Sequence, residues 1–409
     1  MMQAFAQVQS IAEIKFAGNH VTRDRVLRQE LIIKTGDTVI QSKLERSRQS
    51  IMDLGLFKSV TVDVNDSGIV TFTVTEKKYW LLLPRFSHDS DNNRITPGVR
   101  LTINNIAGLN QRLKLTYKQD DAEDADHGKQ DELSVEFNYP RLAGTVYNLD
   151  AAVNIKHSPL QFLQLGVPVS EYKNDEFTIS LLVSRWIQKT APSTGWLAGL
   201  GIRIIKRDYR YLSGLDNVFM DDRAISVLGR LSYSDIHDHL FSRTGVQYGY
   251  QLEQGVQSLG SDYSFNRHLL FYRRFMRLHK VHHNLNIQAR LGFSNGHSSN
   301  LNEDTYSIDG YGDLRAYNRE VSGDAFVLLN LEYLRPVLGK KHARGLLFVD
   351  VGNTYTSNSE LDLSGLKWAA GFGLRWKIRQ FVDLDLSLEY AYDLDNQDDK
   401  VYFKTSGAF

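Results

Sequence analysis

A period-two alternation of apolar and polar residues runs through the chain from Leu81 onward and constrains its fold more than any other feature. The segment 382–390, VDLDLSLEY, has an apolar residue at every second position, and the same rhythm recurs in segment after segment. Successive side chains of a β-strand point to opposite faces, so each such strand has one lipid-like face and one face polar enough to meet water. The pattern does not return to the period of a helix.

Strand length distinguishes two all-β architectures that both alternate. Strands of soluble sandwiches usually have about 5 to 6 residues, whereas the segments here have roughly 9 to 14, which suits membrane-spanning strands. Counting from Leu81 gives about sixteen segments, an even number as in single-chain bacterial barrels. Unpaired strand edges are costly in hydrocarbon, so the sheet must close. The sequence therefore predicts a 16-stranded antiparallel transmembrane β-barrel over residues 80–409.

Composition excludes several other classes of protein. The 409 residues include 48 Lys and Arg against 48 Asp and Glu, so the chain lacks the basic excess typical of nucleic-acid binders. With no Cys, it has neither a disulfide scaffold nor thiolate chemistry. No apolar run approaches the eighteen or so residues that a transmembrane helix needs. We expect no bound nucleic acid and no helical membrane anchor.

Catalytic and metal-binding motifs are not evident. His279, His282 and His283 form one histidine group and His237 with His239 another, but no carboxylate shell lies at useful spacing, so histidine-rich turns are the simpler interpretation. The sequence contains no G-x-S-x-G, H-E-x-x-H or P-loop motif. We expect no enzyme, no metal site and no cofactor.

A small α+β domain is predicted before the barrel, over residues 10–77. Its elements are expected at 11–16 (strand), 23–31 (helix), 42–54 (helix), 60–64 (strand) and 70–74 (strand), in the order β-α-α-β-β. Ser42 and Glu45 are spaced as a capping box, and Gly55 is placed to end the second helix. Residues 1–9 are either the remnant of a leader, since Ala4-Phe5-Ala6 ends like a signal-peptidase site, or an ordinary tail.

One long break interrupts the strand pattern, at about residues 294–322 between the expected eleventh and twelfth strands. It contains the sequence DGYGDLRAYNRE, residues 309–320. Long loops without secondary structure of their own are usually functional. Arg315 is therefore the first residue to examine.

Short motifs along the whole chain resemble one protein family. The N-terminal ones are Gly18-Asn19, Gly36-Asp37 and Leu54-Gly55-Leu56-Phe57. The later ones are Asn105-Ile-Ala-Gly108, Phe137-Asn-Tyr-Pro-Arg141, Asn330-Leu-Glu-Tyr333, Phe348-Val-Asp-Val-Gly352 and the closing Phe409. In this order they resemble the BamA/TamA and two-partner-secretion superfamily, which joins periplasmic POTRA modules to a sixteen-stranded outer-membrane barrel. The resemblance implies a single POTRA domain followed by a bacterial surface antigen barrel.

The family's lid loop folds back into the barrel and carries an arginine in a motif written [VI]-R-G-[FY], which resembles Leu314-Arg315-Ala316-Tyr317 here. By position, the resemblance implies that Arg315 is anchored to Asp350 and Glu332 on the inner wall. The alternation supports this independently, because the apolar neighbours of both carboxylates form the outward set. Arg315, Tyr317, Asp350 and Glu332 are therefore expected to lock the loop. Alanine at 316 departs from the family glycine and raises the cost if that position needs a positive φ.

The seam between the first and last strands is the second expected site. Phe403, Gly407 and Phe409 lie on one face of the last strand, and a terminal Phe resembles the signal that bacterial barrels present to assembly machinery. Gly407 weakens that strand, and Pro84 removes one ladder donor from the first strand. We expect this seam to be the weakest in the barrel.

The resemblance implies an outer-membrane location in a Gram-negative bacterium, with the POTRA domain in the periplasm. It implies clients that are unfolded outer-membrane or secreted polypeptides, bound by β-augmentation on the POTRA domain. One reading is an assembly or insertion factor that opens its seam sideways; another is a translocase, of the two-partner or patatin-type kind, that passes a client through its lumen. A passive porin is a third. Client identity, oligomeric state and the involvement of periplasmic or lipoprotein accessory factors stay open, as does the presence of an upstream domain.

Overall fold

The structure is a computed structural model of the whole chain. It describes residues 9–89, 94–120, 130–164, 167–191, 194–280, 282–296, 298, 306–308, 313–317, 322–337, 339–363, 365–382 and 384–405.

The N-terminal unit has the predicted order β-α-α-β-β. Its elements are β1 (Glu13–Ala17), α1 (Asp24–Arg28), α2 (Gln41–Met52), β2 (Phe57–Val64) and β3 (Ile69–Glu76). The sheet order is β1-β3-β2, with β1 parallel to β3 and β2 antiparallel to it. Leu27 of α1, Ile51 of α2 and Phe72 of β3 are fully buried between helices and sheet. An apolar stripe on each helix and every second residue of each strand thus form one small core.

Two details of the helices differ from the sequence prediction. The first helix ends at Arg28, because the next amides bond three residues back, Glu30 to Leu27 and Leu31 to Arg28, which tightens the last turn. The predicted capping box is wrong. The second helix begins at Gln41 with Ile40 as its N-cap, so Ser42 already lies inside the first turn, and Glu45 instead forms an ion pair with Arg48.

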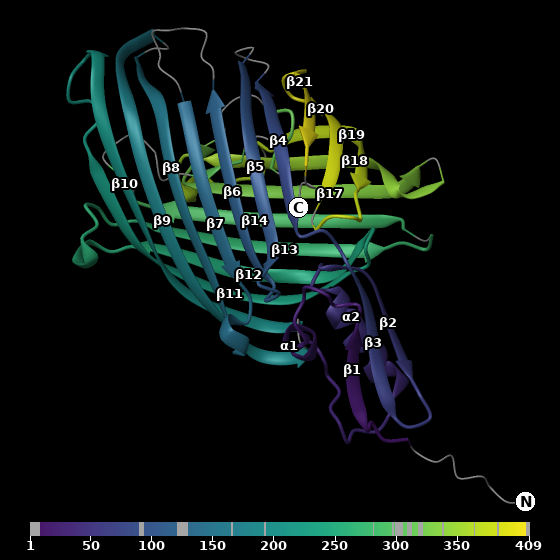
Figure 1. Cartoon of the computed structure of the whole chain (residues 1–409). Coiled ribbons are helices and arrows are strands. Elements are labelled where there is room, and N and C mark those ends of the chain that lie inside the picture. Colours follow the sequence, from purple (N-terminus) through teal and green to yellow (C-terminus); the bar gives the residue numbers. More distant parts are fainter. Residues whose placement is uncertain are drawn as a thin grey trace, which may run out of the picture.

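The rest of the chain forms the predicted sixteen-stranded antiparallel sheet, in which neighbours in sequence are neighbours in space and which curves round a lumen (Figure 1). Its strands are β4 (Trp80–Asp89), β5 (Arg94–Ile106), β6 (Gln111–Asp120), β7 (Gln130–Tyr139), β8 (Tyr147–Gln164), β9 (Val167–Ala191), β10 (Thr194–Gly214), β11 (Asp222–Asp238), β12 (Arg243–Gly255), β13 (Asn266–Arg277), β14 (Asn284–Asn295), β17 (Ala325–Val337), β18 (Lys340–Tyr355), β19 (Lys367–Lys377), β20 (Asp385–Asp393) and β21 (Asp399–Lys404). The remaining pair, β15 (Tyr306–Ser307) and β16 (Ser322–Gly323), lies in the predicted long loop between the eleventh and twelfth strands.

Five strands are longer than predicted: β8, β9, β10, β11 and β18 have 18, 25, 21, 17 and 16 residues. The longest are β8, β9 and β10. The segment 171–176, EYKNDE, is polar on both faces, so the alternation is lost there although the backbone ladder to β8 and β10 continues. Backbone pairing therefore extends these strands beyond the part that apolar alternation marks. Sequence periodicity reports only the lipid-facing part of a strand.

The two faces of the sheet have the expected chemistry. On the outer face Leu347, Phe372 and Phe403 are more than half exposed, as lipid-facing side chains are in the absence of lipid. The inner neighbours Phe348 and Tyr402 are buried. No helix in the described part of the chain is long and apolar enough to cross a membrane.

The N-terminal unit lies beneath one mouth of the sheet and is tied to it (Figure 1). Val382, in the turn between β19 and β20, is 6% exposed and packs in the core of the N-terminal unit. Lys78, in the connection to β4, donates its amide to the carbonyl of Gln380 at 2.7 Å and accepts the amide of Val382 at 3.3 Å. The turn therefore completes the core of the domain above which it lies.

We predict that Val382→Ala loosens this docking. Removing two buried methyl groups should cost roughly 1–3 kcal/mol. Trypsin cleavage at Lys77 and Lys78, whose backbone is held at the junction, should accelerate, as measured by limited proteolysis of the refolded protein. The matched control is Leu388→Ala, on the outer face of β20, which should leave the cleavage rate unchanged. Equal rates in the parent and Val382→Ala would show that the turn does not hold the domain.

Candidate functional site

Arg315 lies at the tip of the inward loop, and its side chain is completely buried against the inner wall. Its Nε and Nη2 donate to the two carboxylate oxygens of Asp350 on β18, at 2.6 and 2.7 Å, and its backbone amide reaches Asp350 Oδ2 at 3.3 Å. Nη1 donates to Glu332 on β17 at 3.1 Å and to Glu389 on β20 at 2.9 Å. The fork geometry of a guanidinium matches a carboxylate with two parallel bonds, so Asp350 fixes the orientation of the tip.

A second arginine completes the cluster from the wall itself. Arg375 on β19 donates to both oxygens of Glu332, at 3.1 and 3.0 Å, and to Glu389 at 2.9 Å. Glu332, Asp350 and Glu389 are all 0% exposed. Buried carboxylates are tolerated only when paired and hydrogen-bonded, and four consecutive strands supply these partners together with the loop.

Two glycines on β19 make space for the cluster. The Arg315 guanidinium carbon lies 3.5 Å from the centre of the Phe348 ring, a cation–π contact. A Cβ at Gly371 would lie 2.4 Å from Cζ of that ring, and a Cβ at Gly373 would lie 2.8 Å from Cγ of Glu389. No side chain larger than glycine fits at either position without moving a member of the cluster.

The next residue of the loop touches the last strand. Ala316 has φ +68°, the left-handed region that the family's glycine favours, and its side chain is completely buried. Its amide donates to the hydroxyl of Tyr402 on β21 at 3.2 Å. The backbone strain of alanine at this φ costs about 1 kcal/mol, and burial of its methyl group stabilises the fold by a similar amount. Alanine in place of glycine therefore changes the free energy of folding very little.

Tyr317 and Leu314 flank these contacts. The Tyr317 hydroxyl accepts a bond from Asn396, in the turn between β20 and β21, at 3.1 Å, and the Lys367 ammonium lies 4.5 Å from its ring centre. Leu314 is 0% exposed and packs with Phe326 and Leu328 of β17. The tip is thus held on both sides of Arg315.

The structure brings the four expected loop-lock residues, Arg315, Tyr317, Asp350 and Glu332, to one half of the lumen. Sequence reasoning missed Glu389, Arg375 and Tyr402. Each lies at an inward position of its strand. For Glu389 and Arg375 the signal available was a charged residue at the middle of an alternating segment, whereas Tyr402 had no such signal. Bringing these three residues to the loop tip and its anchor also needs the stagger between strands, which the sequence alone does not specify.

The expected seam residues are placed separately from this cluster. Phe403 is 58% exposed on the outer face of β21, and Pro84 is exposed on β4, opposite Val99 of β5. Among the described residues no ladder joins β21 to β4. Gly407 and Phe409 lie outside the described residues.

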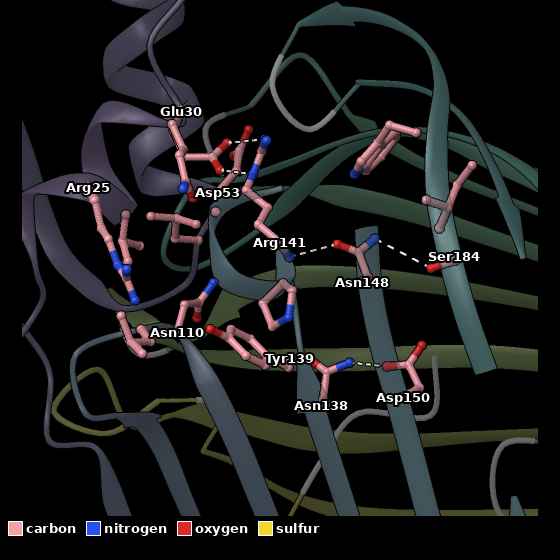
Figure 2. Close-up of a pocket in the computed structure, with 18 of the residues that line it drawn as sticks. Arg25, Glu30, Asp53, Asn110, Asn138, Tyr139, Arg141, Asn148, Asp150 and Ser184 are labelled. Atoms are coloured by element: carbon pink, nitrogen blue, oxygen red, sulfur yellow. Dashed lines mark hydrogen bonds and ion pairs between the residues drawn. The ribbon is translucent and has the colours of Figure 1, made fainter. Parts of the chain in front are cut away.

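A cavity of about 380 Å³ lies where the N-terminal unit meets the mouth of the lumen. Figure 2 shows it between Arg25 and Glu30 of the N-terminal unit and Asn138, Asn148 and Asp150 of the inner wall. The Glu30 carboxylate is 2.7 Å from Arg141 Nε, in the turn after β7, and this ion pair closes one side. The cavity is polar and continues into the lumen.

A hydrogen-bonded chain holds the other side of this junction. The Glu76 carboxylate accepts bonds from the backbone and hydroxyl of Thr22, and Asn105, just before the β5–β6 turn, donates to the same hydroxyl at 2.8 Å. Burial raises the pKa of the Glu76 carboxyl, but the bonds from Thr22 and Val21 outweigh it, so the pKa lies below its ordinary value. Glu76 therefore stays ionised and keeps these bonds at neutral pH.

The histidine groups have structural partners. His237 Nδ1 is 2.8 Å from Asp53 of the N-terminal unit, and His283 Nδ1 is 2.8 Å from the Tyr333 hydroxyl. In the part of the chain that the structure describes, no group of three or more His, Asp or Glu side chains is placed to hold a metal ion.

We predict that Arg315→Ala releases the loop tip while the barrel still assembles. Removing one partner from a buried ionic cluster costs roughly 3–5 kcal/mol. This corresponds to a 100-fold or larger change in the equilibrium constant between the loop tip bound to the wall and the loop tip released. In a Leu314→Cys background the only thiol is protected, so its reaction with a small thiol reagent measures release. Lys118→Ala, which removes a cation paired with Glu132 on another part of the inner wall, is the control and should leave Cys protection intact.

Comparisons with solved structures agree with this fold. BamA from Haemophilus ducreyi lacking POTRA domains 1–3 matches with a TM-score of 0.54 and 14% identity, covering 97% of this chain and 83% of that one. CdiB from Acinetobacter baumannii matches with a TM-score of 0.63 and 15% identity, covering 97% and 73%. CdiB from Escherichia coli matches with a TM-score of 0.68 and 14% identity, covering 97% and 75%. These likenesses confirm a POTRA-type domain followed by a barrel.

Family profiles identify both parts of the chain. The POTRA profile, described as a surface antigen variable number repeat, matches residues 9–77. No curated protein sequence matches the chain. The Omp85 superfamily domain matches residues 105–409, and the chain therefore belongs to the Omp85 superfamily of outer-membrane assembly and transport proteins.

Proposed function

We propose that this protein inserts or assembles other polypeptides in the outer membrane of a Gram-negative bacterium. The POTRA domain binds an unfolded client by β-augmentation, since β1 and β2 are the edges of its three-stranded sheet. The client then pairs with the opened seam between β4 and β21, so that its backbone groups are satisfied before they meet lipid. No cofactor takes part, and the chemistry is non-enzymatic strand exchange.

The observation that carries this proposal is the weak attachment of the described part of the last strand. Among the described residues, β21 has six paired positions with β20 and no ladder to β4, whereas the ladders elsewhere in the sheet have about ten or more pairs in most cases. On its inner side Tyr402 touches the loop tip that Arg315 anchors. The anchored loop holds the wall β17–β20 rigid while the short last strand moves.

Translocation of a client through the lumen is the second candidate. The cavity at the mouth favours it, because it opens between the POTRA domain and the inner wall, where a polypeptide leaving the domain would arrive. Locking the seam between β4 and β21 with a disulfide discriminates between the two mechanisms. Periplasmic or lipoprotein accessory factors are compatible with either.

We predict that a disulfide across the seam abolishes insertion. Cysteines scanned over 81–84 of β4 against 401–404 of β21 provide the lock, since the chain has no native Cys. The control is Leu82→Cys with Leu101→Cys, which face each other in the β4–β5 ladder and lock a pair that stays closed. Insertion of a test barrel into liposomes should stop in the seam-locked protein, continue in the control and return on reduction.

Three other outcomes would redirect the mechanism. Insertion that persists with the seam locked would exclude lateral opening. A lock that spares export of a soluble partner would establish the lumen as the working path. A large, steady single-channel conductance that is the same with and without the seam disulfide would identify a passive pore instead.

We also predict that Tyr402→Phe makes the seam open more often without releasing the loop. The ring remains, but the buried Ala316 amide loses its acceptor, at a cost of about 1–3 kcal/mol. Single-channel recordings in planar bilayers should show more frequent openings than the parent, with Leu314→Cys still protected. Tyr390→Phe, on the outer face of β20, is the control. An unchanged opening frequency in Tyr402→Phe would show that the contact between the loop tip and β21 does not control opening of the seam.

A further inference from the structure

A second cavity, of about 350 Å³, lies inside the lumen, and its lining shares no residue with the Arg315 cluster. The inner faces of β9 to β13 form its wall, and Tyr306 and Ser307 of the inward loop form its other side. We name it the lumenal cavity. Nothing in the loop-anchor mechanism uses it.

The charge of the lumenal cavity is positive. Arg203, Arg230 and Arg267 line it, against a single carboxylate, Glu253. That carboxylate is already satisfied, since Arg203 Nη1 donates to it at 2.7 Å and Ser226 donates to it at 2.7 Å. The Arg267 guanidinium lies over the Tyr306 ring at 5.2 Å. Within the described residues, Arg230 Nε is buried and has no hydrogen-bond partner. A guanidinium in this position is suited to a carboxylate from outside the chain.

The floor of the lumenal cavity is apolar. Leu182, Leu228 and Leu269 line it beside the arginines. Gly199 and Gly201, consecutive inward positions of β10, allow Leu182 to lie close to the wall, since a Cβ at either would come within 3.3 Å of its Cδ1. The combination of an apolar floor, an amide from Gln251 and cationic sides fits a peptide better than a small inorganic anion.

Arg230 connects this cavity to the periplasmic mouth. The same residue lines the cavity of Figure 2, which Arg25 of the POTRA helix α1 and Asn110 also line. The two hollows therefore meet at one guanidinium. A chain that enters beneath the POTRA domain reaches Arg230 before it reaches the loop strand β15.

We propose that the lumenal cavity binds a carboxylate-bearing segment of an extended polypeptide that enters past the POTRA domain, with Arg230 as the principal contact. The proposal rests on the polypeptide-handling function proposed above and adds a site that preferentially binds acidic segments of the client. Arg203 and Arg267 flank the bound carboxylate, and the leucines receive neighbouring apolar side chains. None of the residues that line the site belongs to the Arg315 cluster, so occupancy does not require the loop to leave its anchor.

The test is binding of labelled peptides to the refolded full-length protein in detergent, followed by fluorescence anisotropy. An oligoglutamate peptide should bind, and an oligolysine peptide of equal length should not. Arg230→Gln should weaken oligoglutamate binding by about tenfold or more, the loss expected for one charged hydrogen bond. Lys114→Gln removes a lumenal cation that is already paired with Glu136 at 2.6 Å, and should change binding by less than about twofold.

Several results would overturn the proposal. Equal binding of both peptides to the parent protein would remove the charge preference, and this comparison needs no variant to fold. If Arg230→Gln and Lys114→Gln weaken oligoglutamate binding equally, the peptide responds to the overall positive potential of the lumen rather than to a specific site. Displacement of the peptide by an equal concentration of inorganic phosphate would identify a small-anion site.

Failure of this proposal and failure of the proposed function give different results. Loss of peptide binding in Arg230→Gln with barrel insertion intact supports the site and places it outside the insertion step. Peptide binding in a protein that neither inserts nor exports any client would support the site while overturning the proposed function. Heat-modifiable mobility on a gel checks that each variant is folded.

Discussion

Hydrogen bonding of the backbone in hydrocarbon is the constraint on which the rest of this structure depends. Each unpaired amide or carbonyl in lipid costs several kcal/mol, so all sixteen strands pair with their neighbours along a continuous sheet. Pairing fixes which side chains point out and which point in. Because lipid selects apolar residues outside, charged residues collect inside, where they must satisfy one another. The buried cluster of Arg315, Asp350, Glu332, Glu389 and Arg375 is the result.

The inner wall is consequently divided into two halves of different character. The half formed by β17 to β21 is filled by the loop tip, and its carboxylates are matched to guanidinium groups at hydrogen-bonding distance. The part formed by β7 to β13 lines two cavities that meet at Arg230. A tightly bonded part beside the seam and an open part beside the POTRA domain agree with the proposed mechanism, in which one strand moves while a client is accommodated.

Much of this architecture could be predicted from the sequence. Alternation specified the number of strands and the inward direction of Asp350 and Glu332, and hydrophobic spacing specified the order of the POTRA elements. What periodicity could not supply was the stagger between strands that brings Glu389 and Tyr402 to the loop tip. It also could not show that Val382 belongs to the core of a domain far away in sequence, because an apolar residue in a polar-flanked turn looks the same whether lipid or protein covers it.

The contacts on either side of the loop tip differ in strength, and this difference decides which breaks first. Arg315 makes several charge-assisted bonds, each worth roughly 1.5–3 kcal/mol, whereas the single neutral bond from Ala316 to Tyr402 is worth about 0.5–1.5 kcal/mol. Thermal motion therefore breaks the Ala316–Tyr402 bond long before it separates the loop from the wall. On the proposed mechanism the seam opens against a fixed support, and the lumen keeps its shape while a client strand is exchanged.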